Sequence, residues 1–437
     1  MTSFQAPRGT TDILPHDQLD RLQVQRVCED IANEFGYGYI QTPTFEDASL
    51  FVRTTGEVTD IVQKETYTFD DRGGHTLTLR PEGTPGVCRA YLEHGQHNLP
   101  QPVRLYYYMP MYRFERPQAG RFREFWQFGV EFIGSSTSLA LAELIAMAVK
   151  LMDRSGLRDF QLNIGYLDIL RTVMAKIGLP TSALASALVL IDKKNIEGLE
   201  DLLYENGTSA KLVSDILSLL DVTGGIELLE EMEGMERDYP ELAVPLERFR
   251  KICHWLVIMG IDKFNIDLGV VRGLDYYTGM VFEIEAPMLG AEKQICGGGE
   301  YSLVPLFGGR EVATSGFALG FDRLLLALEN QGYVFRAKRL DLFLVPVSPD
   351  DIQYTVGVAN SLRTAGLRVD LELRGRNVKK AMKYGNSLGA AYVGIIGENE
   401  RNRSLVAVKD MNSGEQKSVP EADLVSYLWE GRNSLQT

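Results

Sequence analysis

Residues 111–134 have the sequence MYRFERPQAGRFREFWQFGVEFIG, and this stretch guides the interpretation of the whole chain. Alternate side chains of an extended strand point to the same face, so Arg113 and Glu115 are expected on one face. Residues 117–120, PQAG, contain the proline and glycine that favour a turn. The pattern predicts a hairpin whose second strand folds back over the first.

Two arginines, Arg121 and Arg123, follow this turn. A guanidinium group presents a planar fork of donors that matches phosphate oxygens, and Phe125 offers a flat face for a nucleobase. The hairpin therefore predicts a site for a nucleotide polyphosphate. On these residues alone, a salt-bridged hairpin without a ligand is the competing interpretation.

The composition is that of a folded protein, because 45% of the 437 residues are hydrophobic and 24% are charged. The length predicts two or three domains, since one hydrophobic core seldom serves so many residues. A net charge of −14 argues against a generally cationic protein that coats nucleic acid. This net charge does not exclude a local basic patch.

The four cysteines are far apart and form no CxxC pair, so neither a zinc site nor a disulfide framework is indicated. The five histidines are scattered outside the arginine-rich blocks, which weakens any histidine-centred catalytic or metal site. No signal-peptide pattern and no apolar run of about 18 residues occurs. We therefore expect a cytoplasmic protein with no membrane partner.

The first part of the chain predicts helices around an antiparallel sheet. Apolar residues recur at helical spacing over 17–35 and 139–152. Segments rich in β-branched and aromatic residues predict strands at 39–43, 67–69, 76–79, 103–109 and 125–132. No strand is predicted between 153 and 174.

A leucine-rich helical stretch follows at 175–259, and strand patterns return at 264–271, 280–286 and 313–318, before a helix at 321–330. We interpret 175–259 as an insertion that the main sheet straddles. From residue 340 the rhythm becomes βαβαβ, which predicts a small domain with a largely parallel sheet. The fold class is therefore an α+β core with an antiparallel sheet and a helical insertion, plus a small α/β C-terminal domain.

The hairpin resembles motif 2 of class II aminoacyl-tRNA synthetases, specifically the histidyl branch, through 112–115 and 121–131. Other blocks resemble the same family in its order: APRGTTDILP at 6–15, motif 1 at 42–62, LRPEGTPG at 79–86, VVRGLDYYTGMVFE at 270–283, the second histidine block at 295–309, and GFALGFDRL of motif 3 at 316–324. The resemblance covers nearly the whole chain.

This resemblance implies activation of histidine with ATP and Mg²⁺ to histidyl-adenylate and pyrophosphate, followed by transfer of histidine to the 3′ end of tRNA(His). It also implies a homodimer formed through motif 1, around Pro43. The implied domains are a catalytic core at 1–174 and 260–333, a helical insertion at 175–259, and an anticodon-binding domain at 340–437.

The resemblance further implies roles for individual residues around ATP. Arg113 would hold the α-phosphate, Glu115 the adenine side, and Arg121 the terminal phosphates. Phe125 and Arg323 would cover the two faces of adenine. Arg272 would join Arg113 as a catalytic residue, by offsetting charge near the α-phosphate as the histidine carboxylate attacks.

The implied histidine-binding residues divide between the two ends of the amino acid. Glu82, Thr84 and Gln127 would take the α-amino and carboxylate end, and Glu131 and Tyr277 the imidazole. The two remaining residues of this set are tyrosines, Tyr276 and Tyr301. An analogue without ring nitrogens would leave buried polar groups unpaired, which favours selectivity. Ordinary aromatic packing is the alternative for all three tyrosines.

The implied tRNA contacts fall in two places. Gln118 and Arg123 belong to the motif 2 hairpin. A basic stretch within an otherwise acidic protein contains Arg374, Arg376, Lys379 and Lys380 and suits an RNA backbone. A solvated helix face is the alternative from composition alone.

This sequence departs from the family pattern in the second histidine block. GGRYDGLV is common there, whereas in this chain Glu300, Tyr301 and Ser302 follow Gly299. Trp126 stands where many members have histidine or tyrosine. We interpret Gly297 to Gly299 as a close backbone approach to a ligand, with a tight turn as the alternative. The rival functions are a histidine-sensing regulatory subunit of ATP phosphoribosyltransferase, and a class II synthetase for another amino acid.

Overall fold

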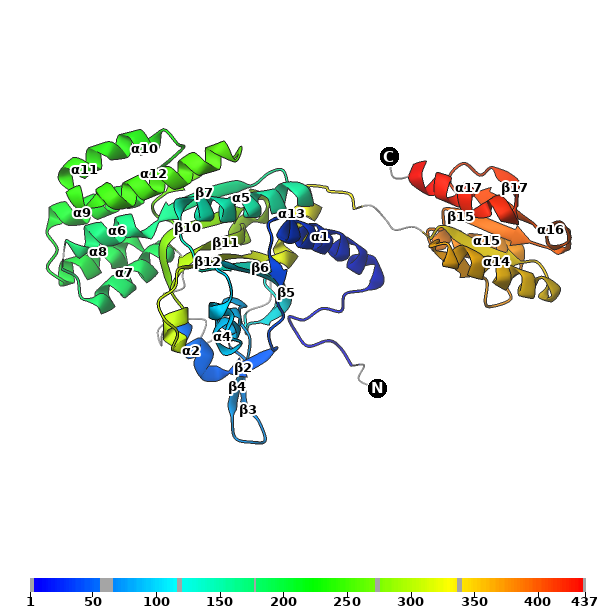
Figure 1. The fold of residues 1–437 in the computed structure, drawn as a ribbon, viewed down its shortest axis with the longest axis horizontal. Coiled ribbons are helices and arrows are strands. Elements are labelled where there is room, and N and C mark those ends of the chain that lie inside the picture. The colour runs from blue at the N-terminus through cyan, green and yellow to red at the C-terminus, as the bar shows by residue number, and fades with distance from the viewer. Residues whose placement is uncertain are drawn as a thin grey trace. The chain divides into compact units, whose positions relative to one another are not determined.

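The computed structural model describes residues 4–55, 66–115, 120–176, 178–271, 276–335 and 340–434. The chain divides into two compact units, Met1–Phe335 and Arg336–Thr437, each with its own apolar core. The two units are described separately below (Figure 1).

The first unit is built on a nine-stranded sheet with the strand order β1-β5-β6-β12-β11-β10-β7-β9-β8. Its strands are β1 Gly38–Tyr39, β5 Val103–Tyr112, β6 Glu124–Ile133, β7 Gln161–Tyr166, β8 Thr223–Gly224, β9 Asn265–Asp267, β10 Tyr277–Glu285, β11 Gln294–Tyr301 and β12 Thr314–Gly320. All pairs from β5 to β7 are antiparallel. The predicted fold class is confirmed, although β1 pairs with β5, and β7 with β9, in parallel.

Two strands that we expected in the antiparallel sheet, at 67–69 and 76–79, form a second sheet together with a strand at 45–47 that was not predicted. These strands are β2 Phe45–Asp47, β3 Thr68–Asp70 and β4 Thr76–Leu79, in the order β2-β4-β3. The prediction of a single sheet was therefore wrong. Short strands with similar composition carry no information on their distant partners, because pairing is decided by packing of the whole unit.

Helices cover the large sheet and frame its loops. They are α1 Pro15–Glu34, α2 Ala48–Thr55, α4 Thr84–Glu93, α5 Ser138–Ser155 and α13 Phe321–Asn330. Thr137 caps the start of α5, and Gly156, in the left-handed conformation, ends it. α5 packs against α1 and against the helical insertion while crossing β10 to β12.

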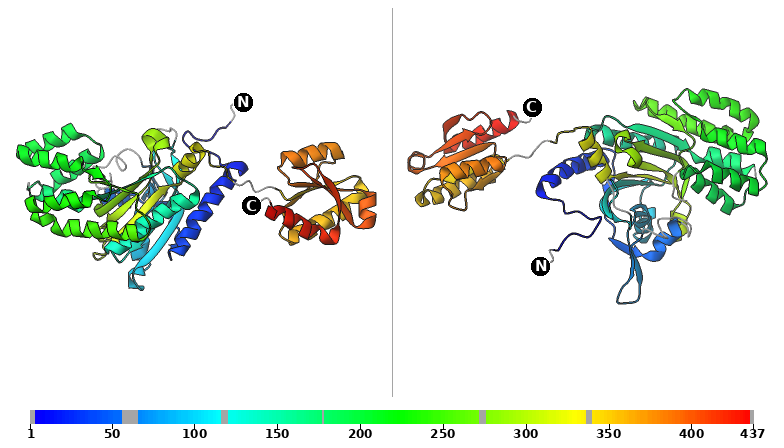
Figure 2. Two further views of the ribbon diagram at one scale, coloured as in Figure 1. Left: turned by 90° about the horizontal axis from the view of Figure 1, so that it is seen from above. Right: turned by 180° about the vertical axis from the view of Figure 1, so that it is seen from behind.

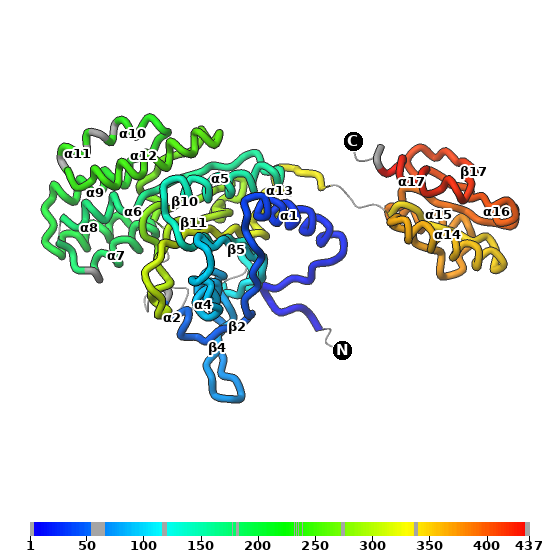
Figure 3. Tube along the Cα trace, in the orientation of Figure 1, coloured from blue at the N-terminus to red at the C-terminus, as the bar shows by residue number. Residues whose placement is uncertain are grey.

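The helical insertion gathers at the β8 edge of the sheet (Figure 2). The helix α6 Leu167–Ala175 leads into it, and its helices are α7 Thr181–Asp192, α8 Ile196–Glu205, α9 Ala210–Leu220, α10 Leu228–Glu231, α11 Met235–Asp238 and α12 Ala243–Ile258. The chain returns from α12 to β9 and β10, so segments on both sides of the insertion build one sheet (Figure 3).

Side chains along β6 alternate between the apolar core and the opposite face of the sheet. Phe128 and Val130 are fully buried in the apolar core. Gln127, Gly129 and Glu131 therefore share the other face. A side chain at Gly129 would lie 2.3 Å from the ring of the buried Tyr107 on β5, so glycine makes room for that ring.

The second unit has the predicted α/β architecture, with a five-stranded sheet in the order β14-β13-β15-β16-β17. Its elements are β13 Leu342–Pro346, α14 Ile352–Thr364, β14 Val369–Leu371, α15 Val378–Ser387, β15 Tyr392–Ile396, α16 Glu398–Arg403, β16 Leu405–Asp410, β17 Gln416–Pro420 and α17 Glu421–Ser434. Leu342 and Leu344 pack in one core, and Phe343 and Val345 in another. The sheet is thus covered on both faces. It is mixed rather than largely parallel as predicted, because β13 pairs in parallel with β14 and β15, whereas β16 pairs antiparallel with β15 and β17.

Candidate active site

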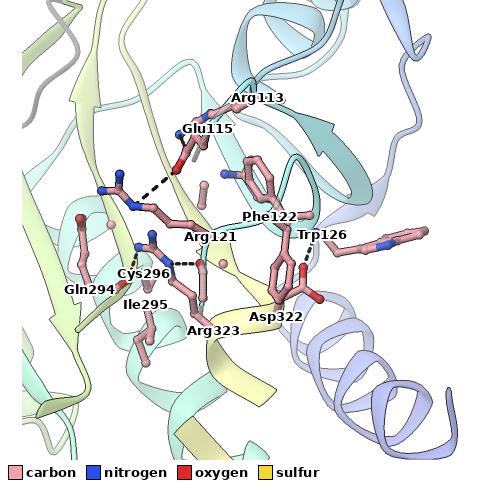
Figure 4. Close-up of a pocket in the computed structure, with 16 residues that line it drawn as sticks. Arg113, Glu115, Arg121, Phe122, Trp126, Gln294, Ile295, Cys296, Asp322 and Arg323 are labelled. Atoms are coloured by element: carbon pink, nitrogen blue, oxygen red, sulfur yellow. Dashed lines mark hydrogen bonds and ion pairs between the residues drawn. The ribbon is translucent and has the colours of Figure 1, made fainter. Parts of the chain in front are cut away.

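One pocket lies where the β5–β6 hairpin meets β11, β12 and the start of α13 (Figure 4). Its lining contains all five residues expected around ATP, namely Arg113, Glu115, Arg121, Phe125 and Arg323. Four of these residues belong to the hairpin and one to α13. The structure therefore brings together a set that is widely separated in sequence.

We call this pocket the nucleotide pocket, after the ligand that the sequence predicts for it. Its arginines are held by backbone oxygens and carboxylates. Arg113 Nε donates to Pro81 O at 3.0 Å, and its guanidinium lies 5.3 Å from the centre of the Phe125 ring. Arg323 Nε donates to Gly120 O at 3.0 Å. Arg121 Nε lies 3.4 Å from Glu115 Oε2. These contacts fix cationic groups around a space that suits an anion.

Glu292 is a member of this arrangement that the sequence analysis missed. It ends the 3-10 segment η4 Pro287–Glu292, between β10 and β11. Its carboxylate oxygens lie 2.8 Å from Arg121 Nε and 2.7 Å from Arg323 Nη2. No motif distinguishes a single acidic residue in such a turn, so only the fold reveals this contact.

A second, smaller pocket adjoins the first. It is lined by six residues expected to bind histidine, namely Glu82, Thr84, Gln127, Tyr276, Tyr277 and Tyr301, and by Tyr107, which the sequence did not single out. Arg113 and Gln127 line both pockets. A ligand group in the small pocket can therefore approach a nucleotide at Arg113.

Glu131, also expected to bind histidine, is buried and does not line the small pocket, which we call the amino-acid pocket after its expected ligand, but it contacts two residues that do. It accepts hydrogen bonds from Thr84 Oγ1 at 2.7 Å and from the Tyr301 hydroxyl at 2.5 Å. Burial raises the pKa of Glu131 to about 8, although both hydrogen bonds act in the opposite direction. A side chain at Gly316 would lie 2.3 Å from Glu131 Oε2, so only glycine admits the carboxylate here.

The rest of the amino-acid pocket also combines polar groups with aromatic walls. The Tyr276 hydroxyl donates to Glu82 Oε2 at 2.8 Å, and the Tyr276 and Tyr301 rings meet edge to face at 5.8 Å. Gln127 Oε1 is buried and accepts no hydrogen bond from the residues that the structure describes. A buried acceptor of this kind suits an ammonium donor on a ligand.

Two further residues support the site without lining the small pocket, and sequence reasoning assigned neither. Arg80 is buried and donates to Pro110 O and Thr42 O, both at 2.8 Å, which ties the 79–86 loop to β5. Asp322 accepts from the Trp126 backbone N–H at 2.6 Å and from Arg21 at 2.5 Å. Both residues lie in blocks that resemble the family, at 79–86 and 316–324, but the resemblance assigned them no role.

Two of the predicted residues, Arg272 and Gln118, lie outside the described residues. The Arg123 guanidinium stacks over Phe114, 4.1 Å from its ring centre, and does not line the nucleotide pocket. Gly297 to Gly299 lie within strand β11, so the alternative of a tight turn was wrong.

The second unit carries a basic groove on α15 and the loop before it. Its lining contains Arg374, Arg376, Lys380, Lys383 and Tyr384. The Arg376 guanidinium lies 3.9 Å above the Tyr384 ring, and Arg376 Nη1 pairs with Glu372 at 2.8 Å. Lys379 is exposed outside the groove lining.

Solved structures with a similar fold are histidyl-tRNA synthetases, a class of aminoacyl-tRNA synthetase. The chain is similar to a solved structure of apo histidyl-tRNA synthetase from S. aureus, with a TM-score of 0.71 and 30% identity over 98% of this chain and 100% of that chain. It shares the fold of histidyl-tRNA synthetase from Nostoc sp. PCC 7120, with a TM-score of 0.83 at 22% identity over 98% of this chain and 100% of that one.

The family model described as histidyl-tRNA synthetase matches residues 9–324, and the anticodon binding domain model matches residues 341–430. The histidine–tRNA ligase of Methanocaldococcus jannaschii is 40% identical over 97% of this chain and 99% of its own length. That of Geobacillus thermodenitrificans is 40% identical over 98% of each chain. The chain belongs to the histidyl-tRNA synthetase family.

Proposed function

We propose that this chain activates histidine with ATP, forming histidyl-adenylate and pyrophosphate, and then transfers histidine to the 3′ end of tRNA(His). The observation that carries this proposal is that Arg113 lines both the nucleotide pocket and the amino-acid pocket. A cation at that junction faces the α-phosphate and the attacking carboxylate together. It lowers the cost of bringing two anions into contact.

In the nucleotide pocket, Arg121 would bind the terminal phosphates and Glu115 the adenine side. Phe125 and Arg323 would cover the two faces of adenine. Mg²⁺ would enter with ATP and be held mainly by its phosphates. Among the described residues no cluster of three or more histidine, cysteine or acidic side chains could hold a metal ion, and phosphate-bound Mg²⁺ does not need one.

In the amino-acid pocket, Glu82, Thr84 and Gln127 would bind the α-amino and carboxylate end of histidine. Glu131 and Tyr277 would face the imidazole, with Tyr276 and Tyr301 completing the walls. Glu131 can donate a hydrogen bond while it is protonated, and it can accept one when ionised. It is therefore suited to either ring nitrogen.

Arg272 remains a proposed catalytic residue on the strength of its sequence block. Gln118 and Arg123 remain proposed tRNA contacts, as do Arg374, Arg376, Lys379 and Lys380 in the second unit. The proposed domains are a core at 1–174 and 260–333, an insertion at 175–259 and an anticodon-binding domain at 340–437.

We also propose a cytoplasmic homodimer that pairs around Pro43. All four cysteines are buried and free, which suits a reducing compartment. None of the helices in the described part of the chain is long and apolar enough to span a bilayer. Mass measurement at working concentration tests the dimer, because a monomer with full activity would contradict it.

Pyrophosphate exchange into ATP, assayed with each amino acid in turn and without tRNA, tests the reaction. Exchange that depends on histidine supports the proposal, and exchange with another amino acid alone would refute it. The regulatory-subunit alternative predicts histidine binding without any exchange. The arginines of the nucleotide pocket and the second unit favour the synthetase.

A further inference from the structure

An ion pair between a partly exposed arginine and a buried glutamate joins the helical insertion to the main sheet. Arg248 lies on α12, and its Nη2 is 2.5 Å from Oε1 of Glu300, which is buried on β11. Glu300 is also a position at which this chain departs from the family's usual sequence. Neither residue lines the nucleotide pocket or the amino-acid pocket.

Glu300 occupies an irregularity in the pairing of β10 with β11. Tyr277 pairs with Tyr301 and Val281 with Gly299, so residues 278–280 face the single residue Glu300. Glu300 Oε2 accepts the Met280 backbone N–H at 2.9 Å, which satisfies a donor in the bulge.

The carboxylate reaches this position because residue 279 is glycine. A side-chain carbon at Gly279 would lie 2.3 Å from Glu300 Oε2 and 3.4 Å from Arg248 Nη1. The backbone of β10 therefore lies directly against the ion pair. A displacement of the carboxylate would be transmitted to the bulge.

Arg248 anchors the other side of this arrangement. Its Nη1 donates to the Tyr166 hydroxyl at 2.9 Å, and its Nη2 donates to Ser136 O at 2.6 Å. Tyr166 ends β7, and its ring stacks on Phe249, the next residue of α12. One guanidinium thus connects the insertion to β7, to the loop after β6 and to β11.

The ends of β10 and β11 nearest this cluster carry the tyrosines of the amino-acid pocket. Tyr301 directly follows Glu300 and donates to Glu131, while Tyr276 and Tyr277 stand at the start of β10. The Ser302 backbone N–H donates to Tyr276 O at 3.0 Å, which joins the two strand ends. The bulge therefore sets the position of all three tyrosines.

We infer that Arg248 and Glu300 are positioning residues for histidine, through which the helical insertion fixes the tyrosine wall of the amino-acid pocket. This inference rests on the proposed function. The nucleotide pocket is built from the β5–β6 hairpin and α13, on which neither residue lies. Loss of the ion pair is therefore expected to weaken histidine binding more than ATP binding.

The test compares Arg248→Ala, Glu300→Gln and the double variant with the wild-type enzyme. In Glu300→Gln, the glutamine keeps an oxygen for the Met280 N–H and removes the negative charge. In Arg248→Ala, the truncation keeps the apolar core intact, because Arg248 is partly exposed. Arg248→Lys tests rescue by a conserved charge. Lys251→Ala is the matched control, because Lys251 lies on the same helix and pairs with the exposed Glu247, at 3.2 Å.

The readouts are the KM values for histidine and for ATP in pyrophosphate exchange, the calorimetric Kd for histidine, and thermal unfolding. We expect both single variants to raise the KM and the Kd for histidine about tenfold, equivalent to about 1.4 kcal/mol. The KM for ATP should stay within about twofold of the wild-type value, which corresponds to a much smaller change in binding free energy than that for histidine. The double variant should be no worse than the more damaged single variant, since both remove one interaction.

Arg248→Lys should restore part of the histidine affinity, and Lys251→Ala should resemble wild type. Equal rises in both KM values, or lowered unfolding temperatures with unchanged histidine affinity, would overturn the inference and leave a purely structural ion pair. A wild-type enzyme without histidine-dependent exchange would refute the proposed function instead. The two failures are therefore distinct.

Discussion

Glu292 lies 2.8 Å from Arg121, the arginine proposed to bind the terminal phosphates of ATP. The same carboxylate contacts Arg323, so it bridges two cations of the nucleotide pocket. A carboxylate and a phosphate compete for the same guanidinium donors. We therefore expect Glu292 to compete with the terminal phosphates of ATP for Arg121.

Replacing Glu292 with glutamine is expected to lower the KM for ATP about two- to fivefold, because a partly exposed ion pair contributes up to about 1 kcal/mol. Pyrophosphate exchange at varied ATP concentrations measures this change. Glu285→Gln is the control, since Glu285 pairs with Lys293 at 2.8 Å on the same hairpin. A higher KM for ATP in Glu292→Gln would show that Glu292 assists nucleotide binding.

The pKa of Glu131 predicts a pH-dependent stability. Because burial raises this pKa from 4.5 to about 8, the folded protein binds one more proton than the unfolded chain between these values. The stabilisation is complete below the unfolded pKa and is lost as the pH rises through the folded pKa. The unfolding temperature of the ligand-free protein should therefore fall across this window, and Glu131→Gln should reduce the fall. Identical pH slopes for the two proteins would contradict this assignment.

Replacement of Arg272 by alanine is expected to lower the rate of histidine activation about 100- to 1000-fold, the usual cost of one electrostatic contact to the transition state. The apparent KM for histidine should change much less, because the contact develops with the transition state. Single-turnover formation of histidyl-adenylate measures the effect. Near-normal turnover would assign Arg272 a structural role.

Removal of the second unit after Phe335 is expected to preserve adenylate formation and to abolish efficient tRNA charging. Both pockets lie within the first unit, which has its own core. Pyrophosphate exchange and tRNA charging are measured on the truncated and full-length proteins. Equal charging by the two proteins would exclude the second unit as an anticodon reader.

The basic groove predicts how tRNA binding depends on salt. Glutamine at Arg374, Arg376 and Lys380 should weaken tRNA binding and lower the slope of log K against log salt by about one for each phosphate that the protein no longer neutralises. Lys379→Gln serves as a comparison, because Lys379 lies on the same helix outside the groove. It should change the slope less. An unchanged slope in the triple variant would favour the alternative interpretation, in which the basic stretch is a solvated helix face.

Helices and long strands could be predicted from local patterns, whereas two central strands could not. Helical spacing located α1 within two residues of its observed bounds, Pro15–Glu34. No strand was predicted at β7 or β11. In β11, glycines replace the residues that favour strands, because a side chain at Gly298 would lie 2.2 Å from Gly316 O on the neighbouring strand.

The residues of the candidate site likewise divide into those that the sequence predicts and those that it does not. Motif resemblance pointed to many of the residues that line the two pockets, because these residues occur in recognisable blocks. Tyr107, Glu292 and Arg248 escaped detection, since each acts through a partner distant in sequence and looks like an ordinary core or surface residue. Such contacts become visible only when the strands that carry them are placed side by side.

The pairing of β6 with β12, from Ile133 with Thr314 to Gln127 with Gly320, has a consequence for synthesis of the chain. β6 leaves the ribosome well before β12 is translated, and the whole helical insertion is made in between. At about 5–20 residues per second, one hydrogen-bonding edge of β6 stays open for on the order of tens of seconds. An open edge is a template for pairing with other chains. The yield of folded protein should therefore depend on translation speed and on chaperones that shield this edge of the nascent nucleotide-site hairpin.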